Sequence, residues 1–137
     1  NVKKNSYLRK ELLKPTKIYV KEILSLIKYN LINGCANITG GGLADNIKRV
    51  IPKGLTASID LDKIKTKKIF SWLKKNNISD KEMLKTFNCG VGFCIIIDKK
   101  NFNKIKKYFK KEYQPYIIGE IISGENKVKL NDKIIWS

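Results

Sequence analysis

Apolar residues recur along this chain at two spacings, and the change from one to the other predicts a domain that mixes helices and strands. Apolar residues three and four positions apart predict helices over residues 15–31, 43–51, 64–76, 80–87 and 102–109. Short apolar or alternating runs predict strands over residues 35–39, 55–60, 91–97, 116–122, 127–130 and 134–136. Helices and strands in this mixture are typical of a layered α+β domain.

Helix boundaries are predicted by local signals. Thr16 can cap the first helix, and Gly34 lies where a helix commonly ends in a left-handed residue. Ser79 and Glu82 have the spacing of a capping box. The apolar stripe expected to bury the first helix consists of Ile23, Leu24, Ile27 and Leu31.

The strands differ in how much of their surface they are expected to bury. Residues 55–60 alternate between apolar and polar, so we expect one polar face. Residues 91–97 are almost entirely apolar, as in a central strand that is covered on both faces. Asn131 and Asp132 predict the turn of a terminal hairpin.

Length and composition point to one domain outside the membrane. A chain of 137 residues with 42% hydrophobic residues can bury a core of its own. No apolar run approaches the ~20 residues of a membrane span, and the basic N-terminus lacks the apolar block of a signal peptide. We therefore expect a soluble, cytoplasmic protein without a membrane partner.

The net charge of +17 raises the possibility of a polyanion partner. All basic residues except Arg9 and Arg49 are lysines, and they are spread through every segment. Proteins that read nucleic acid usually concentrate charge on one face and favour arginine. The pattern argues against nucleic acid and favours small anions such as nucleotides. A basic module that binds anions or nucleic acid without catalysis remains the alternative function.

The cysteines predict neither a disulfide framework nor a metal site. Cys35, Cys89 and Cys94 form no C-x-x-C pair, and the chain has no histidine. We expect all three to be reduced core or near-core residues and no metal to be bound. A nucleophilic Cys89 is the minority interpretation, because it would need a base.

Two glycine-rich segments are the strongest candidates for a binding site. In Asn37–Leu43, three glycines lie between a predicted strand and a predicted helix, where backbone N–H groups can converge on a phosphate. A second cluster, Phe87–Gly92, precedes another predicted strand, and the two could share one pocket. The competing interpretation of a lone glycine triplet is a tight turn from strand to helix.

Three collinear segments together resemble one family. They are Leu12–Lys21 (LLKPTKIYVK), Ile38–Pro52 (ITGGGLADNIKRVIP) and Lys85–Gly92 (KTFNCGVG). In order and spacing they resemble the C-terminal half of the aminoimidazole ribonucleotide synthetases, and Tyr116–Ile121 (YIIGEI) fits that family's last core strand. The resemblance implies a layered α/β/α domain with a mixed, mostly antiparallel sheet.

The resemblance also implies a reaction and the partners it needs. Enzymes of this family are ATP-dependent cyclo-ligases of purine biosynthesis, which phosphorylate the formyl oxygen of formylglycinamidine ribonucleotide before an amidine nitrogen attacks. ATP and Mg²⁺ would bind mainly to an N-terminal domain that also forms a homodimer. Residues 1–14 would be a linker from that missing domain and 15–137 the C-terminal domain, which we expect to be inactive alone and to hold neither cofactor tightly.

Site residues follow from the matched motifs. Thr39, Gly40, Gly41 and Gly42 would hold the phosphate of a small substrate, while Asn88 and Gly90 would line the opposite wall. For Asn88 the competing interpretation is a turn-forming side chain. Asn46 is a modest candidate for a substrate contact. Asn37 stands where family members commonly carry histidine; it can make a polar contact but cannot shuttle protons near neutral pH. No catalytic residue can be named.

Overall fold

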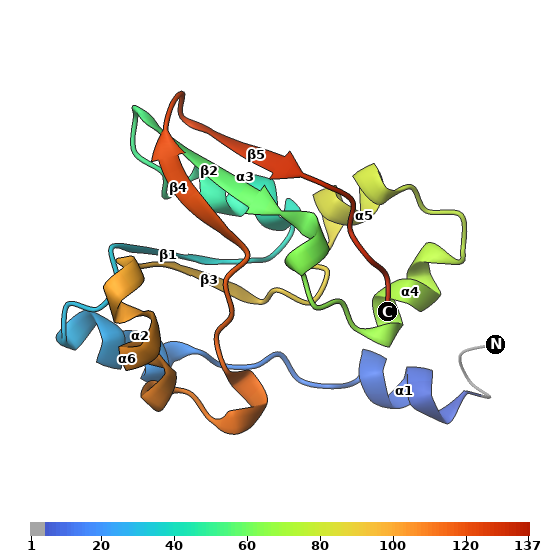
Figure 1. Cartoon of the computed structure of the whole chain (residues 1–137). Coiled ribbons are helices and arrows are strands. Elements are labelled where there is room, and N and C mark those ends of the chain that lie inside the picture. Colours follow the sequence, from blue (N-terminus) through green and yellow to red (C-terminus); the bar gives the residue numbers. More distant parts are fainter. Residues whose placement is uncertain (1–4) are drawn as a thin grey trace.

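A computed structural model describes residues 5–137 of the chain (Figure 1). The helices are α1 (Ser6–Leu12), α2 (Val20–Lys28), α3 (Gly42–Lys48), α4 (Lys68–Lys74), α5 (Asp80–Thr86) and α6 (Phe102–Ile105). The strands are β1 (Gly34–Asn37), β2 (Leu55–Asp60), β3 (Phe93–Ile96), β4 (Gly119–Ser123) and β5 (Lys127–Asn131). Single 3₁₀ turns span Leu61–Lys63, Lys99–Asn101, Lys106–Tyr108 and Lys111–Tyr113.

The strands form two small sheets. β1 and β3 make an antiparallel ribbon in which Ala36 lies opposite Cys94. In the other sheet, β2 lies between β4 and β5 and pairs with β4 antiparallel and with β5 parallel. Two antiparallel pairs and one parallel pair confirm the predicted α+β class with a mixed, mostly antiparallel arrangement.

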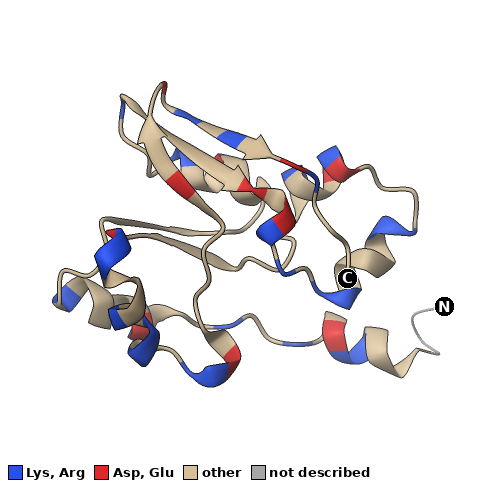
Figure 2. Ribbon diagram, in the orientation of Figure 1, with Lys and Arg blue, Asp and Glu red and all other residues tan. Residues whose placement is uncertain are grey.

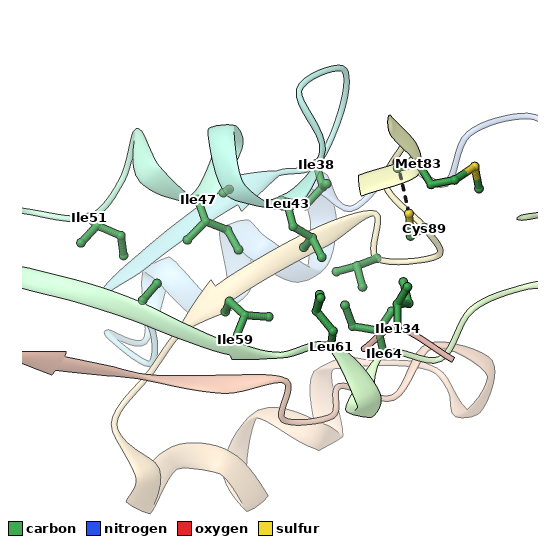
Figure 3. Close-up of a cluster of buried hydrophobic side chains, with 13 residues drawn as sticks. Ile38, Leu43, Ile47, Ile51, Ile59, Leu61, Ile64, Met83, Cys89 and Ile134 are labelled. Atoms are coloured by element: carbon green, nitrogen blue, oxygen red, sulfur yellow. Dashed lines mark hydrogen bonds between the residues drawn. The ribbon is translucent and has the colours of Figure 1, made fainter. Parts of the chain in front are cut away.

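The larger core lies between the two sheets and the helices α3 and α5. From the sheets it receives Ala36 of β1 and Ala57 and Ile59 of β2. Leu43 and Ile47 of α3 point into the same space, as Figure 3 shows. Met83 of α5, Leu43 and Ala57 are at most 1% exposed, so this core excludes water from the inner face of α3.

A second, smaller core covers the other face of the β1–β3 ribbon. Ile23 and Leu26 of α2 pack there with Ile105 of α6, against Phe93 and Ile95 of β3. Because neighbouring residues of a strand point to opposite faces, Phe93 and Ile95 meet this core while Cys94 and Ile96 meet the larger one. The ribbon is thus covered by α2 and α6 on one face and by α3 together with the three-stranded sheet on the other, which agrees with a layered α+β domain (Figure 1).

Strand β2 spans the residues predicted for it and is amphipathic as expected. Ala57 and Ile59 face the larger core, whereas Ser58 and Asp60 face the opposite side, where both are within hydrogen-bond distance of the Asn131 amide. Thr56 on the polar side is nevertheless buried, because its hydroxyl donates to the Glu125 carbonyl, which lies in the turn that crosses this end of the sheet.

Two predictions about strand pairing are wrong. Residues 91–97 were expected to form a central strand, but β3 pairs with β1 alone among residues 5–137. An apolar run indicates that both faces of a strand are covered by side chains. It does not indicate whether both edges of the strand are hydrogen-bonded to neighbouring strands. The predicted hairpin about Asn131 and Asp132 is also absent, because β5 ends at Asn131 after pairing with β2. The chain then continues without a strand, and the Trp136 indole donates to Asp80 at 3.0 Å.

Helix α2 begins later than predicted and turns a different face inward. Tyr19 is its N-cap residue, so Thr16 does not cap it, and the left-handed residue after its end is Asn30 rather than Gly34. Leu24 and Ile27 are 59% and 50% exposed. The buried positions of the helix are Ile23 and Leu26, which lie three residues apart. The predicted stripe was therefore right for Ile23, wrong for Leu24 and Ile27, and lacked Leu26.

The predicted linker, residues 1–14, contains helix α1 over Ser6–Leu12; residues 1–4 lie outside the described part. Asn5 caps this helix by accepting the Leu8 N–H at 3.1 Å, and Leu8 is 3% exposed. The segment is therefore ordered in part, and its role as a connection between two domains stays a prediction.

The capping box of α5 is half formed. The Ser79 hydroxyl accepts the Glu82 N–H at 3.2 Å, as predicted, and so satisfies one free donor of the first turn. The Glu82 carboxylate does not reach back to the cap and instead accepts the Thr86 hydroxyl at 2.8 Å. The Asp80 carboxylate in this turn also accepts a hydrogen bond from the Lys74 ammonium at 2.8 Å. This contact, together with the one from the Trp136 indole, lowers the pKa of Asp80.

Basic residues lie on helices, strands and connections in most parts of the fold, as Figure 2 shows. This spread agrees with the sequence pattern and differs from the single charged face of a typical nucleic-acid reader. None of the helices in the described chain is long and apolar enough to cross a membrane.

Candidate functional site

The glycine triplet joins the end of β1 to the start of α3. Gly41 is the N-cap residue with φ of 92°, and Gly42 begins the helix with φ of 63°. Both values lie in the left-handed region, which residues with a Cβ rarely adopt. The competing interpretation of a tight strand-to-helix turn is therefore correct as a description of the backbone, and it does not exclude a binding role.

Gly42 also permits a close approach between two helices. A Cβ placed on it would lie 1.8 Å from the Leu84 carbonyl oxygen and 3.3 Å from that of Phe87, both at the end of α5. Gly40 differs, because a Cβ there would meet no atom within 4 Å. The three glycines thus have separate roles: Gly40 is open, Gly41 makes the turn, and Gly42 allows the packing.

Asn46 holds the loop from inside the fold. Its side-chain amide donates to the Gly42 carbonyl at 2.7 Å, with longer contacts of 3.2 Å to Gly40 and 3.4 Å to Thr39. The residue is 5% exposed, so these contacts replace the water that the carbonyls would otherwise bind. The Asn46 amide therefore makes a structural contact with the loop backbone, and its contact with a substrate stays a prediction.

This arrangement decides where the loop's N–H groups point. In a trans peptide the C=O of one residue and the N–H of the next point in opposite directions, and the described chain has no cis peptide. Because the Thr39 and Gly40 carbonyls turn toward Asn46, the N–H groups of Gly40 and Gly41 turn away from it. Neither N–H donates to an acceptor within residues 5–137. Two free donors are therefore available to an anion.

The second glycine segment is a tight turn. The Asn88 side-chain oxygen accepts the Gly90 N–H at 3.1 Å, and the Val91 N–H donates to the Asn88 carbonyl at 2.8 Å. Cys89 has φ of 50° and Gly90 has φ of 103°. The Asn88 side chain thus stabilises a turn, which agrees with the interpretation of Asn88 as a turn-forming residue.

The two glycine segments lie next to each other, but only the second one borders the cavity between the two sheets. The Ile38 N–H donates to the Gly92 carbonyl at 3.0 Å, and Gly42 touches the α5 end that leads into Asn88. A cavity of about 590 Å³ is lined by residues 90–92 but not by 39–42. The glycine triplet and the second glycine segment therefore do not meet in this cavity.

Charge near the loop is mixed. The Asp45 carboxylate lies beside Gly41, because a Cβ built on Gly41 would be 3.1 Å from its Oδ2 atom. Asn37 and Thr39 are exposed, and the Thr39 hydroxyl lies 3.4 Å from the Asn46 side-chain oxygen. An anion on the loop would meet the N–H groups on one side and a negative charge on another.

Cys89 and Cys94 are unsuited to nucleophilic chemistry. Cys89 is 1% exposed, and its thiol donates to the Met83 carbonyl at 3.5 Å (Figure 3). Burial raises the pKa of Cys89 to about 11 and that of Cys94 to about 12, so both are thiols at neutral pH. All three cysteines are free, in agreement with the prediction. No group of three His, Cys, Asp or Glu side chains in the described chain could hold a metal ion.

One polar residue of the cavity was not selected from the sequence. The Lys17 ammonium is shielded from solvent, lies 3.4 Å from the centre of the Tyr113 ring and has no hydrogen-bond acceptor in the described chain. Glu22 is 4.0 Å away, and burial lowers the pKa of Lys17. Its neighbour in space, Tyr113, is 96 positions distant in sequence, so no local pattern could have indicated the contact.

Comparison with known proteins places these features in context. A family model described as the AIR synthase related protein, C-terminal domain, matches residues 2–131. The chain is 42% identical over 125 residues to the phosphoribosylformylglycinamidine cyclo-ligase of Alkaliphilus oremlandii, covering 90% of the chain and 37% of that protein.

Two further relatives extend the comparison. The cyclo-ligase of Staphylococcus epidermidis is 45% identical over 116 residues, covering 83% of the chain and 34% of that protein. The trifunctional purine biosynthetic protein adenosine-3 of Chironomus tentans is 47% identical over 113 residues, covering 82% of the chain and 8% of that protein. The chain thus spans about a third of the length of the cyclo-ligases that it matches.

Proposed function

The chain belongs to the family of the AIR synthase related protein, C-terminal domain, and on this basis we propose that it serves in an ATP-dependent cyclo-ligase of purine biosynthesis. The observation that carries the proposal is the similarity to cyclo-ligases over about 90% of the chain. The reaction converts formylglycinamidine ribonucleotide to aminoimidazole ribonucleotide and releases ADP and phosphate.

The remaining two thirds of such an enzyme would supply the chemistry of phosphoryl transfer. Residues 5–137 contain no cluster of acidic side chains that could hold Mg²⁺. On the family resemblance we assign ATP, Mg²⁺ and the homodimer contacts to an N-terminal domain, which would be the partner of this one. The 137-residue chain should not turn over substrate alone.

The glycine loop is the proposed site for the substrate phosphate. The free N–H groups of Gly40 and Gly41 support this role, with the exposed Thr39 hydroxyl beside them. Gly42 would act indirectly, by setting the position of the loop against α5. Asn88 and Gly90 would shape the neighbouring wall, since the Asn88 side chain is engaged in its own turn.

A chimeric enzyme tests the activity. Replacing the aligned third of the Staphylococcus epidermidis cyclo-ligase with this chain should leave ATP-dependent formation of aminoimidazole ribonucleotide within about tenfold of the parent rate. The Asn37→His variant of the chimera should change kcat less than about threefold, because we assign residue 37 a polar contact and not a proton transfer. A soluble, folded chimera without activity would contradict the proposed function, and a large gain on Asn37→His would contradict the role of Asn37.

Phosphate binding can be measured on the 137-residue chain itself. Titration with ribose 5-phosphate should shift the amide resonances of Gly40 and Gly41, with a Kd on the order of 1 mM because few contacts are made. The matched variant Asp45→Asn should bind a few-fold more tightly, since it removes the negative charge beside Gly41. Gly54, in another open turn with positive φ, is the internal control and should not shift. Shifts spread over the lysine-rich helices would instead favour the alternative of nonspecific anion binding.

A further inference from the structure

Two unpaired strand edges face one cavity. This cavity, of about 590 Å³, is lined on one side by residues 90–97, which contain β3, and on the other by residues 113–121, which lead into β4. Among residues 5–137, β3 pairs only with β1 and β4 pairs only with β2. Each strand therefore has one free edge, and both free edges belong to the same cavity.

The register of β3 fixes which of its backbone groups are free. In an antiparallel pair, successive residues turn their N–H and C=O alternately toward the partner and away from it. The Ile38 N–H donates to Gly92, so Gly92 and Cys94 turn toward β1. Phe93 and Ile95 consequently present their N–H and C=O groups to the cavity.

The same argument applies to β4. The Asp60 N–H donates to the Ile118 carbonyl at 2.8 Å, so Ile118 and Glu120 turn toward β2. Gly119 and Ile121 then present their backbone groups to the cavity from the other side. Unpaired backbone groups in an apolar setting are costly, so this pair of edges calls for a partner.

The cavity is lined mainly by apolar side chains above and below the edges, although charged residues such as Lys17, Lys65, Lys67, Lys111 and Glu112 also contribute to its lining. The apolar side chains come from the larger core on one side and the smaller core on the other. The residues that line it include Ile47, Ala57 and Ile59 from the larger core, and Ile23, Ile105 and Phe109 from the smaller. A strand lying between β3 and β4 would direct alternate side chains into these two cores.

We propose that this cavity is a slot for one additional β-strand, which pairs with β3 on one edge and β4 on the other and unites the two sheets into one. The strand is extended, about five residues long and apolar at every position, because both of its faces are buried. It comes from the two thirds of the longer cyclo-ligases that this chain does not match, and for that source the proposal rests on the proposed function.

The surroundings of Lys17 favour a main-chain partner in the cavity and argue against a free anion there. Its ammonium lacks a hydrogen-bond acceptor, but Glu22 at 4.0 Å and the Tyr113 ring already offset its charge. The end of an incoming strand supplies neutral carbonyl acceptors and does not require a second charge. The polar demand of the cavity is thus met by main-chain groups, as in recognition by strand addition.

Amide hydrogen exchange tests the slot. In the dilute 137-residue chain, Phe93, Ile95, Gly119 and Ile121 should exchange at least tenfold faster than Cys94, Ile96 and Glu120. Overlapping 12-residue peptides from the unmatched part of the Staphylococcus epidermidis cyclo-ligase serve as the probe. One apolar window should slow all four edge amides at least tenfold. Edge amides already protected in the dilute free chain, or no peptide that protects both edges, would overturn the proposal.

Matched variants and the chimera separate the possible failures. Ile95→Pro removes one donor that faces the slot and should abolish the protection of Gly119 by the peptide, whereas Ile95→Val keeps the donor and should preserve it. In the chimeric enzyme the same edge amides should be protected without added peptide. If the chimera is active but its edge amides exchange rapidly, the proposed additional strand is wrong and the proposed function stands. If the edge amides are protected but the chimera is inactive, the proposed function is wrong and the strand stands.

Discussion

Gly42→Ala should destabilise the domain by about 4 kcal/mol or prevent it from folding. The new Cβ would lie 1.8 Å from the Leu84 carbonyl oxygen, and the residue would have to keep a φ of 63°. Left-handed backbone alone costs an ordinary residue roughly 1–3 kcal/mol, and a backbone atom such as this carbonyl cannot rotate away as a side chain could. The free energy of unfolding in urea, followed by tryptophan fluorescence, measures the effect.

Gly40→Ala is the matched control in the same triplet. Nothing lies within 4 Å of its added Cβ, and Gly40 has no positive φ. We expect its stability to stay within about 0.5 kcal/mol of the wild type, or to rise slightly because the unfolded chain loses freedom. Equal losses from the two variants would show that close packing against α5 is not what requires glycine at position 42.

Asn46→Asp should cost about 3 kcal/mol at neutral pH, although it exchanges a single amide nitrogen for oxygen. The buried amide donates to the Gly42 and Gly40 carbonyls, and a carboxylate would place negative charge against both. An uncompensated buried charge and lost donors are among the largest single-residue effects known. Urea unfolding of the variant and the wild type at the same pH provides the measurement.

The pH dependence identifies the cause. Burial beside carbonyl groups should raise the pKa of the introduced carboxyl in the folded state above the ~3.9 of the unfolded chain. The folded variant then binds the proton more tightly, so its stability rises as pH falls and its deficit shrinks toward pH 4. Asn103→Asp, at an exposed position of α6, is the control. Its free energy of unfolding should equal that of the wild type at every pH. A deficit that is constant with pH would exclude the buried charge as its origin.

Local signals predicted the elements well where the cause was local. The residues of β2 were predicted without error, and the Ser79 cap forms as expected, because alternation and capping depend on neighbours within a few positions. The turn at Gly41 and Gly42 followed from the need for positive φ. The family was recognised from three collinear motifs, and the family model confirms it.

Long-range pairing is where the sequence was insufficient. An apolar strand does not reveal which of its edges are paired: β3 was expected in the centre of a sheet, but within residues 5–137 it pairs with β1 alone. The parallel pairing of β5 with β2, about 70 positions apart, replaced a predicted local hairpin. The inward orientation of Asn46 was likewise invisible, because an asparagine in a short helix is usually solvated and its neighbours in sequence do not show which face is buried.

The position of β2 has a consequence for how the protein is made. Both of its neighbours come from residues 119–131, so β2 has no sheet partner until that late part of the chain has left the ribosome. Its apolar face, with Ala57 and Ile59, must meanwhile be shielded by α3 or by a chaperone. We expect the earlier residues to collapse around α3 and the β1–β3 ribbon first, and the release of residues 119–131 from the ribosome to set the time at which the domain becomes resistant to proteases.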